Sequence, residues 1–229
     1  MSEEVRVKNT GLRGVTVADS AISFIDGEQG ILIYRGYRIE DLAEKSSYLE
    51  TVHLLLYGTL PGSAQLNELR QALRSHRQVP EFVLQSMRSW PRDAEPMDVL
   101  QAAIPMLAMA DTEANQNSRQ AVIKRAIALI AQMPTLVAAW HRIRNGQEVL
   151  PPDENLGHAA NFLWMLKGEK PEQALARDLD VCLVLHADHT FNASTFAARE
   201  VVSTRASMYA GVSAALGALS GALHGGANT

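Results

Sequence analysis

Residues 207–228 read SMYAGVSAALGALSGALHGGAN, and this stretch decides the fold of the chain. We interpret 207–223 as a helix rich in small residues. It leads into His224, which is followed by two consecutive glycines, Gly225 and Gly226. Because glycine has no Cβ and can adopt positive φ, the backbone can turn sharply there and lie close to a ligand. The pattern predicts an imidazole at an exposed corner at the end of a helix.

The predicted helix 207–223 has an almost flat surface, so the backbone of another helix can approach it closely. The small residues on it are Ala210, Gly211, Ala214, Gly217, Ala218 and Gly221. In water such a helix is useful only if it is buried on most sides, so we expect a central helix. Two settings remain open. The helix packs against its symmetry mate at a subunit interface, or it lies in the core of one subunit.

The rest of the chain is predicted to be helical after one small β-hairpin. Residues 21–34 alternate apolar and other side chains on both sides of a turn at 26–30, which is the pattern of a hairpin. There is no internal repeat and no alternation of strands and helices. Start and stop signals place helices at 49–57, from 63, 118–146, 153–168, 171–186, 194–205 and 207–223, with caps at Ser47, Ser63, Ser118 and Asp153. The fold class is therefore all-α with a small hairpin near its start.

The composition is that of a globular protein. The 229 residues are 47% hydrophobic and 20% charged, with a net charge of −4, and the lack of a basic cluster argues against nucleic acid. The longest uncharged stretch, 206–223, is mostly Ala, Gly and Ser, so we expect no membrane helix. The N-terminus lacks an apolar signal region. The lone cysteine, Cys182, lies in an apolar run that predicts a core position, and its isolation fits a cytoplasmic location.

A second polar segment, 186–195, reads HADHTFNAST and lies between two strongly apolar predicted helices. Polar groups at such a joint either hold it together by hydrogen bonds or face a polar ligand. His186, Asp188 and His189 are also metal-ligand types. However, the two histidines lack the i, i+4 spacing of zinc proteases, and no distant ligand cluster accompanies them, so we expect no metal. The sequence contains no G-x-S-x-G, phosphate-binding, dinucleotide-binding or C-x-x-C motif.

Several ordered motifs resemble the citrate synthase family. Those near the start are GLRGV at 11–15, IDGEQGILIYRGY at 25–37 and LLLYGTLP at 54–61. The segments 187–195 and 221–228 look like the two active-site segments in the N-terminal part of that family. The resemblance runs from about Gly11 to the end of the chain, and the histidine interval suits the shorter, prokaryotic-type members. It implies the multi-helical large domain of that fold.

The resemblance implies condensation of acetyl-CoA with oxaloacetate to citrate and CoA through an enol or enolate, the first step of the tricarboxylic acid cycle. No cofactor is implied, because acetyl-CoA is a substrate. His224 matches the family histidine that donates a hydrogen bond to the developing enolate oxygen. His189 matches the histidine that binds oxaloacetate. The family also implies a homodimer, here through small-residue helices including 207–223.

Further residues match positions around the two histidines. Gly225, Gly226 and Ala227 occupy positions where backbone amides would approach the substrates. Asn192 and Ser194 resemble the polar groups that support the two histidines from behind. His186 matches no catalytic position of the family, so we interpret it as structural.

The resemblance also implies that residues 1–229 correspond to the N-terminal part of the large domain. The family's aspartate base, its third histidine, its oxaloacetate-binding arginines and its small domain would then lie beyond Thr229. We therefore expect no synthase activity from these residues alone. Two alternatives remain open: a 2-methylcitrate synthase, which uses propionyl-CoA, and a non-catalytic dimerising module of a split or degenerate enzyme.

Overall fold

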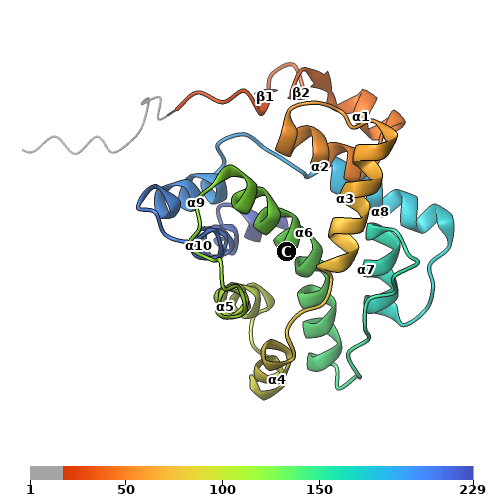
Figure 1. Cartoon of the computed structure of the whole chain (residues 1–229), viewed down its shortest axis with the longest axis vertical. Coiled ribbons are helices and arrows are strands. Elements are labelled where there is room, and N and C mark those ends of the chain that lie inside the picture. Colours follow the sequence, from red (N-terminus) through yellow and green to blue (C-terminus); the bar gives the residue numbers. More distant parts are fainter. Residues whose placement is uncertain (1–17, 229) are drawn as a thin grey trace, which may run out of the picture.

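The computed structural model describes residues 18–228, and within that range it contains ten α-helices and one three-stranded antiparallel sheet (Figure 1). The predicted all-α class with a small hairpin is confirmed. The motif at 11–15 lies outside the described residues. The helices are α1 (Ile39–Lys45), α2 (Tyr48–Tyr57), α3 (Ser63–Ser75), α4 (Glu81–Ser89), α5 (Pro96–Ala110), α6 (Arg119–Arg144), α7 (His158–Lys167), α8 (Gln173–Leu185), α9 (Ala193–Ser203) and α10 (Met208–Leu219).

The hairpin predicted at 21–34 is present. Strand β1 (Ser23–Asp26) pairs with β2 (Ile31–Tyr34) in antiparallel register, with Ser23 opposite Tyr34. The Asp26 carboxylate closes the turn by accepting the backbone N–H groups of Glu28 and Gln29, each over 3.0 Å. A third strand, β3 (Tyr37–Arg38), pairs with β2 and was not predicted.

Helix α6 runs through the middle of the molecule, with α4 and α5 on one side and α3 and α7 on the other (Figure 1). Its Leu136 and Trp140 pack into the largest hydrophobic cluster, which α4, α5 and α10 share. Its Ile127 packs into a second cluster with residues of α2 and α3. Among residues 18–228, α6 is the one helix long and apolar enough to cross a membrane. Packing on two clusters accounts for that apolar character.

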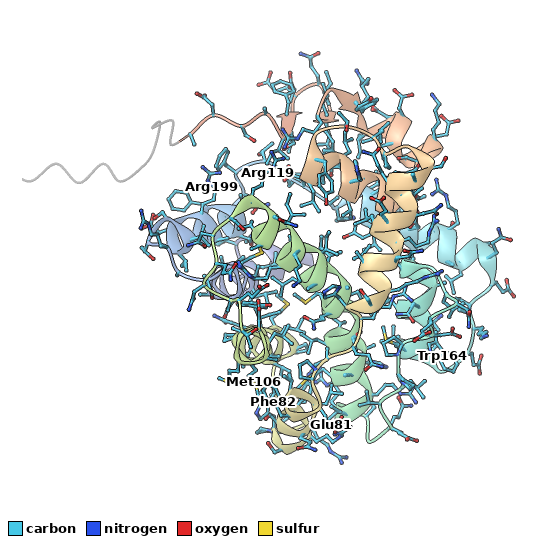
Figure 2. All side chains as sticks on the ribbon, in the orientation of Figure 1. Glu81, Phe82, Met106, Arg119, Trp164 and Arg199 are labelled. Carbon is cyan, nitrogen blue, oxygen red and sulfur yellow. The ribbon has the colours of Figure 1, made fainter. Side chains whose placement is uncertain are left out.

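Figure 2 shows Glu81 and Phe82 on α4 and Trp164 on α7, and both Glu81 and Phe82 are exposed to solvent. A third cluster lies at the other end of the molecule. It joins the hairpin to α8, because Tyr34 of β2 and Val184 of α8 are both fully buried in it. The hairpin is therefore anchored to the helix that leads into the polar segment 186–195.

The helix caps were predicted with mixed success. Ser47 caps α2 by accepting the N–H of Glu50, and the Glu50 carboxylate accepts the N–H of Ser47 over 2.7 Å, which completes a capping box. Ser118 caps α6 as predicted. The caps predicted at Ser63 and Asp153 were wrong. A glycine stands at each of the two N-cap positions, and Asp153 instead accepts the N–H of Asn155 over 2.8 Å.

The small-residue helix α10 packs closely on α9 and α5. A Cβ added at Gly211 would lie 2.7 Å from Val202 Cγ1, and one at Gly217 would lie 2.6 Å from Gln101 Nε2. The close approach predicted from the flat surface is therefore confirmed. Burial is less complete than expected, since among the described residues of α10 only Tyr209, Gly211 and Leu216 are buried.

Two further details of the sequence interpretation were wrong. The last helix ends at Leu219, because the N–H of Ser220 closes the final turn on Leu216 O and the chain then leaves the helix at Gly221. Cys182 is exposed and does not lie in the core. Helix α8 presents only Val184 as a fully buried side chain, so most of the apolar run around Cys182 faces outward or is half-buried.

His158 gives the protein a predictable sensitivity to acid. Its ring stacks on Tyr48 with centroids 5.2 Å apart, and burial, followed by the charge of Arg77, lowers the pKa of His158 from 6.5 to about 4. Because the unfolded chain binds this proton more readily, stability falls as the pH drops from about 6.5 towards 4. Between pH 7 and pH 5 we expect His158 to cost roughly 2 kcal/mol of unfolding free energy.

Denaturant unfolding at the two pH values measures this loss. His158→Gln should be the less stable protein at pH 7 but should lose less stability on acidification. An equal loss in both proteins would contradict the assignment.

Candidate active site

Hydrogen bonds hold the polar segment between α8 and α9 at both of its ends. At the end of α8, Nδ1 of His186 donates to Cys182 O over 2.7 Å, in agreement with a structural role. At the start of α9, Asn192 is the N-cap, and its Oδ1 accepts the N–H of Thr195 over 2.8 Å. Asn192 therefore supports the helical turn that carries Ser194.

The middle of the segment is a turn built on Asp188. The Asp188 carboxylate accepts the N–H of Thr190 over 2.9 Å. Thr190 has φ of 57°, a left-handed conformation that is rare for a β-branched residue. His189 lies between these two residues. Its side chain is exposed, and its ring makes no hydrogen bond to another described residue. The backbone turn therefore determines from which point, and in which direction, this side chain leaves the chain.

His224 lies in the turn that follows α10. Its N–H donates to Gly221 O over 2.9 Å, and its side chain is half-buried. Its Nε2 lies 2.7 Å from Oγ of Ser194 on the first turn of α9. This bond joins two of the segments that the sequence singled out, 30 residues apart in the chain. The corner predicted at this histidine is present, with the ring less exposed than expected.

The two positions after His224 require glycine, because there is no room for a side chain at either of them. A Cβ at Gly225 would lie 2.4 Å from Leu219 O, and one at Gly226 would lie 3.1 Å from Gly221 O. Neither glycine adopts the positive φ that the sequence suggested. Both begin the 3-10 turn Gly225–Asn228, to which the backbone of Ala227 also belongs.

This turn borders a pocket of about 570 Å³. Leu219, Ser220 and the two glycines line it from the end of α10, and Glu95, Met97 and Asp98 line it from the start of α5. Space for a ligand therefore adjoins the backbone of the candidate site. That the imidazoles of His189 and His224 face one shared cleft remains a prediction.

Sequence reasoning missed two residues of the hairpin that contact the polar segment. The Tyr34 hydroxyl donates to Asp188 O over 2.8 Å and accepts the N–H of Asp188 over 3.1 Å. The Ser23 hydroxyl donates to the Asp188 carboxylate. The one signal in the sequence was Tyr34, which lies in a short apolar strand. A tyrosine buried there needs a hydrogen-bond partner for its hydroxyl.

No group of three or more His, Cys, Asp or Glu residues that could hold a metal ion occurs within 18–228. His186 and Asp188 instead use their side chains in the separate hydrogen bonds described above.

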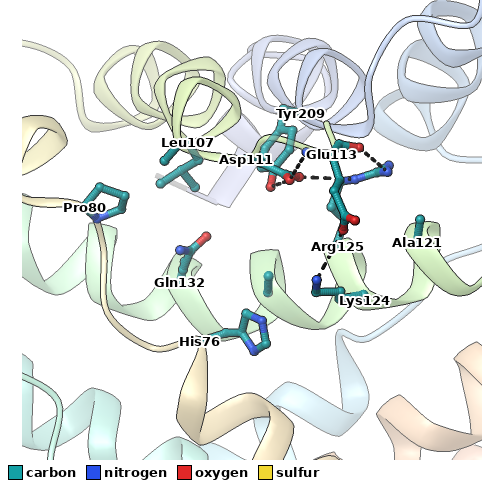
Figure 3. Close-up of a pocket in the computed structure, with 12 residues that line it drawn as sticks. His76, Pro80, Leu107, Asp111, Glu113, Ala121, Lys124, Arg125, Gln132 and Tyr209 are labelled. Atoms are coloured by element: carbon teal, nitrogen blue, oxygen red, sulfur yellow. Dashed lines mark hydrogen bonds and ion pairs between the residues drawn. The ribbon is translucent and has the colours of Figure 1, made fainter. Parts of the chain in front are cut away.

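A second polar cluster lines a pocket of about 200 Å³ between α5, α6 and α10 (Figure 3). The Asp111 carboxylate accepts the Tyr209 hydroxyl over 3.0 Å and pairs with Nε of Arg125 at 3.3 Å. Burial, followed by the hydrogen bond to Asp111, raises the pKa of Tyr209. Arg125 also donates to the carbonyls of Glu113 and Gln116. Its donors are thus used to tie α6 to the loop after α5.

Comparison with known proteins identifies the family. A family model described as citrate synthase, C-terminal domain, matches residues 11–229. The chain is 42% identical over 228 residues to a citrate synthase of Synechocystis sp., covering 100% of this chain and 57% of the relative. It is 45% identical to a citrate synthase of Haloferax volcanii, covering 95% of this chain and 59% of the relative. The chain therefore belongs to the citrate synthase family.

Solved structures agree with this assignment. The citrate synthase of Pyrobaculum aerophilum superposes with a TM-score of 0.90 at 40% identity, covering 99% of this chain and 62% of that one. A ternary complex of the Thermoplasma acidophilum enzyme with carboxymethyl coenzyme A and oxaloacetate superposes with a TM-score of 0.89 at 31% identity, covering 93% and 56%. The chain thus spans less than two thirds of the length of these relatives.

Proposed function

We propose that the complete protein containing these residues is a citrate synthase that condenses acetyl-CoA with oxaloacetate. A base removes a proton from the acetyl methyl group, and the resulting enolate carbon attacks the keto carbon of oxaloacetate. Hydrolysis of the citryl thioester then releases citrate and CoA. The observation that carries the proposal is the 2.7 Å bond between Ser194 and His224 beside a glycine turn and an adjoining pocket.

The bond to Ser194 gives His224 a defined chemical role. A carboxylate with a pKa of about 4 is a weak base for a thioester methyl group, so the enolate oxygen needs a fixed hydrogen-bond donor. Nε2 of His224 is occupied by Ser194, which leaves Nδ1 for the substrate. If the serine hydroxyl donates to Nε2, the neutral ring carries its proton on Nδ1 and can donate it to the thioester oxygen.

The remaining site residues act on the second substrate and on the backbone. His189 would hydrogen-bond oxaloacetate and hold it facing the enolate carbon. Gly225, Gly226 and Ala227 would bring backbone amides to the substrates. The relative solved with oxaloacetate and a coenzyme A analogue supports these two substrate classes.

Assays of CoA release by the complete protein test the proposal. We expect turnover with acetyl-CoA and oxaloacetate, and no release above background from the 229-residue stretch alone, because the relatives are considerably longer. Preference for propionyl-CoA would instead indicate a 2-methylcitrate synthase. A complete protein inactive with both thioesters would favour a non-catalytic module.

We also propose that the protein forms a homodimer through α10. Its small-residue surface, which is half-exposed, supports this proposal, and light scattering would measure the oligomeric state.

Ser194→Ala is expected to lower kcat about tenfold, because one hydrogen bond that fixes the ring tautomer is lost. The KM for oxaloacetate should change little. Ser203→Ala on the same helix is a matched control, since the Ser203 hydroxyl donates only to Glu200 O on the exposed surface. Equal kcat values in the two variants would remove Ser194 from the mechanism.

A further inference from the structure

The turn that carries His189 is held from outside its own segment. Asp188 is contacted by Ser23 of β1 and Tyr34 of β2, which lie 165 and 154 residues away in the chain. We define Ser23, Tyr34 and Asp188 as the hairpin clamp. Three hydrogen bonds, one from Ser23 and two with Tyr34, involve Asp188, which is the residue directly before His189.

The clamp fixes both backbone bonds around His189. Tyr34 binds the N–H and the carbonyl of Asp188, so the peptide groups on the two sides of that residue are held. The same Asp188 carboxylate oxygen that accepts from Ser23 also accepts the N–H of Thr190, beyond the histidine. His189 is therefore bracketed by two anchored residues.

The conformation that the clamp holds is a costly one. A threonine with φ of 57° is disfavoured by about 1–2 kcal/mol, so it persists only where its surroundings determine it. Tyr34 is fully buried, and burial raises the pKa of its hydroxyl, so the hydroxyl stays protonated and available as a donor. The imidazole of His189 has no hydrogen bond of its own to a described residue, so the backbone of this turn is what restrains where the ring can reach.

We infer that Ser23 and Tyr34 are positioning residues for the oxaloacetate site, acting on His189 through Asp188. This inference rests on the proposed function and adds the hairpin to it. The three-stranded sheet, remote in sequence from both active-site segments, then sets the binding of one substrate. Both hydroxyls contact Asp188, and the Tyr34 hydroxyl also lies 3.3 Å from Leu185 O, so we assign both residues a positioning role.

Steady-state kinetics of the complete protein test the clamp. Ser23→Ala and Tyr34→Phe each remove one hydroxyl, and each is expected to raise the KM for oxaloacetate about tenfold while the KM for the acyl-CoA changes less than about twofold. Ser23→Thr keeps the hydroxyl and should restore the wild-type KM. The double variant should show less than the product of the two effects, because both act through Asp188.

Thr135→Val is the matched control. Thr135 is buried on α6, and its hydroxyl donates to Arg77 O over 2.8 Å, away from the polar segment. The Thr135→Val variant should have a lower melting temperature, with the KM for oxaloacetate and the KM for the acyl-CoA both unchanged. Clamp variants that behave like this control, or that raise both KM values equally, overturn the inference and leave the proposed function standing. A wild-type protein without turnover refutes the proposed function, and the inference falls with it.

Discussion

His224→Ala is expected to lower the kcat for CoA release about 10²–10³-fold in the complete protein, the loss measured when one donor to a developing oxyanion is removed. The reason is the geometry at the end of α10, where Nε2 of His224 lies 2.7 Å from Ser194 Oγ. In the proposed mechanism, Nδ1 is then the donor to the thioester oxygen. The KM for oxaloacetate should stay within about threefold, because the proposed mechanism assigns His224 to the acyl-CoA.

A donor in place of the ring should recover part of the rate. His224→Asn offers an amide N–H at a position similar to Nδ1, so we expect a kcat above that of the alanine variant. His141→Ala, at an exposed position on α6, is the control and should retain wild-type kcat. A His224→Ala protein with more than about a tenth of the wild-type kcat would show that the enolate is stabilised by another group.

Gly225→Ala is expected to lower kcat/KM about 100-fold, although the change adds a single methyl group. The new Cβ would lie 2.4 Å from Leu219 O and 2.7 Å from Leu219 Cδ1, and a backbone carbonyl cannot move aside without moving the end of α10. The turn must shift instead, and it carries His224 with it. A displacement of about 1 Å at a catalytic group is sufficient for a loss of this size.

The matched control is Gly27→Ala in the hairpin turn, where no heavy atom lies within 4 Å of the added Cβ and φ is not positive. It should leave kcat/KM unchanged. Circular dichroism of both variants would confirm that each retains its helices. Wild-type kinetics for Gly225→Ala would mean that the turn adapts without moving the imidazole.

Local signals in the sequence were sufficient for most of the fold. Ser47 with Glu50 three residues later, and Gly58 with φ of 91°, mark the two ends of α2 as their chemistry requires. One error arose where a polar residue had a competing partner. Asp153 has the chemistry of a cap, but it closes its own turn and pairs with Lys170 at 3.4 Å. Cys182 lies in an apolar run whose outer side no described element covers.

The candidate site was predictable only in part. The turn after His224 carries a local signal in its two glycines, and the resemblance to a family supplied the roles that we propose for the two histidines. The hairpin clamp has no local signal, because it joins residues more than 150 positions apart through two hydroxyl groups. Such contacts depend on how the third hydrophobic cluster docks the hairpin onto α8, which periodicity does not specify.

The bond between Ser194 and His224 also limits how this region can vary in length. It closes a loop made of α9, a connection at 204–207 and α10, with the two residues at its outer ends. A residue inserted in α10 would rotate everything after it by about 100° and advance it by about 1.5 Å. Single insertions or deletions in either helix should therefore separate the two side chains, whereas an added residue in the connection should be tolerated.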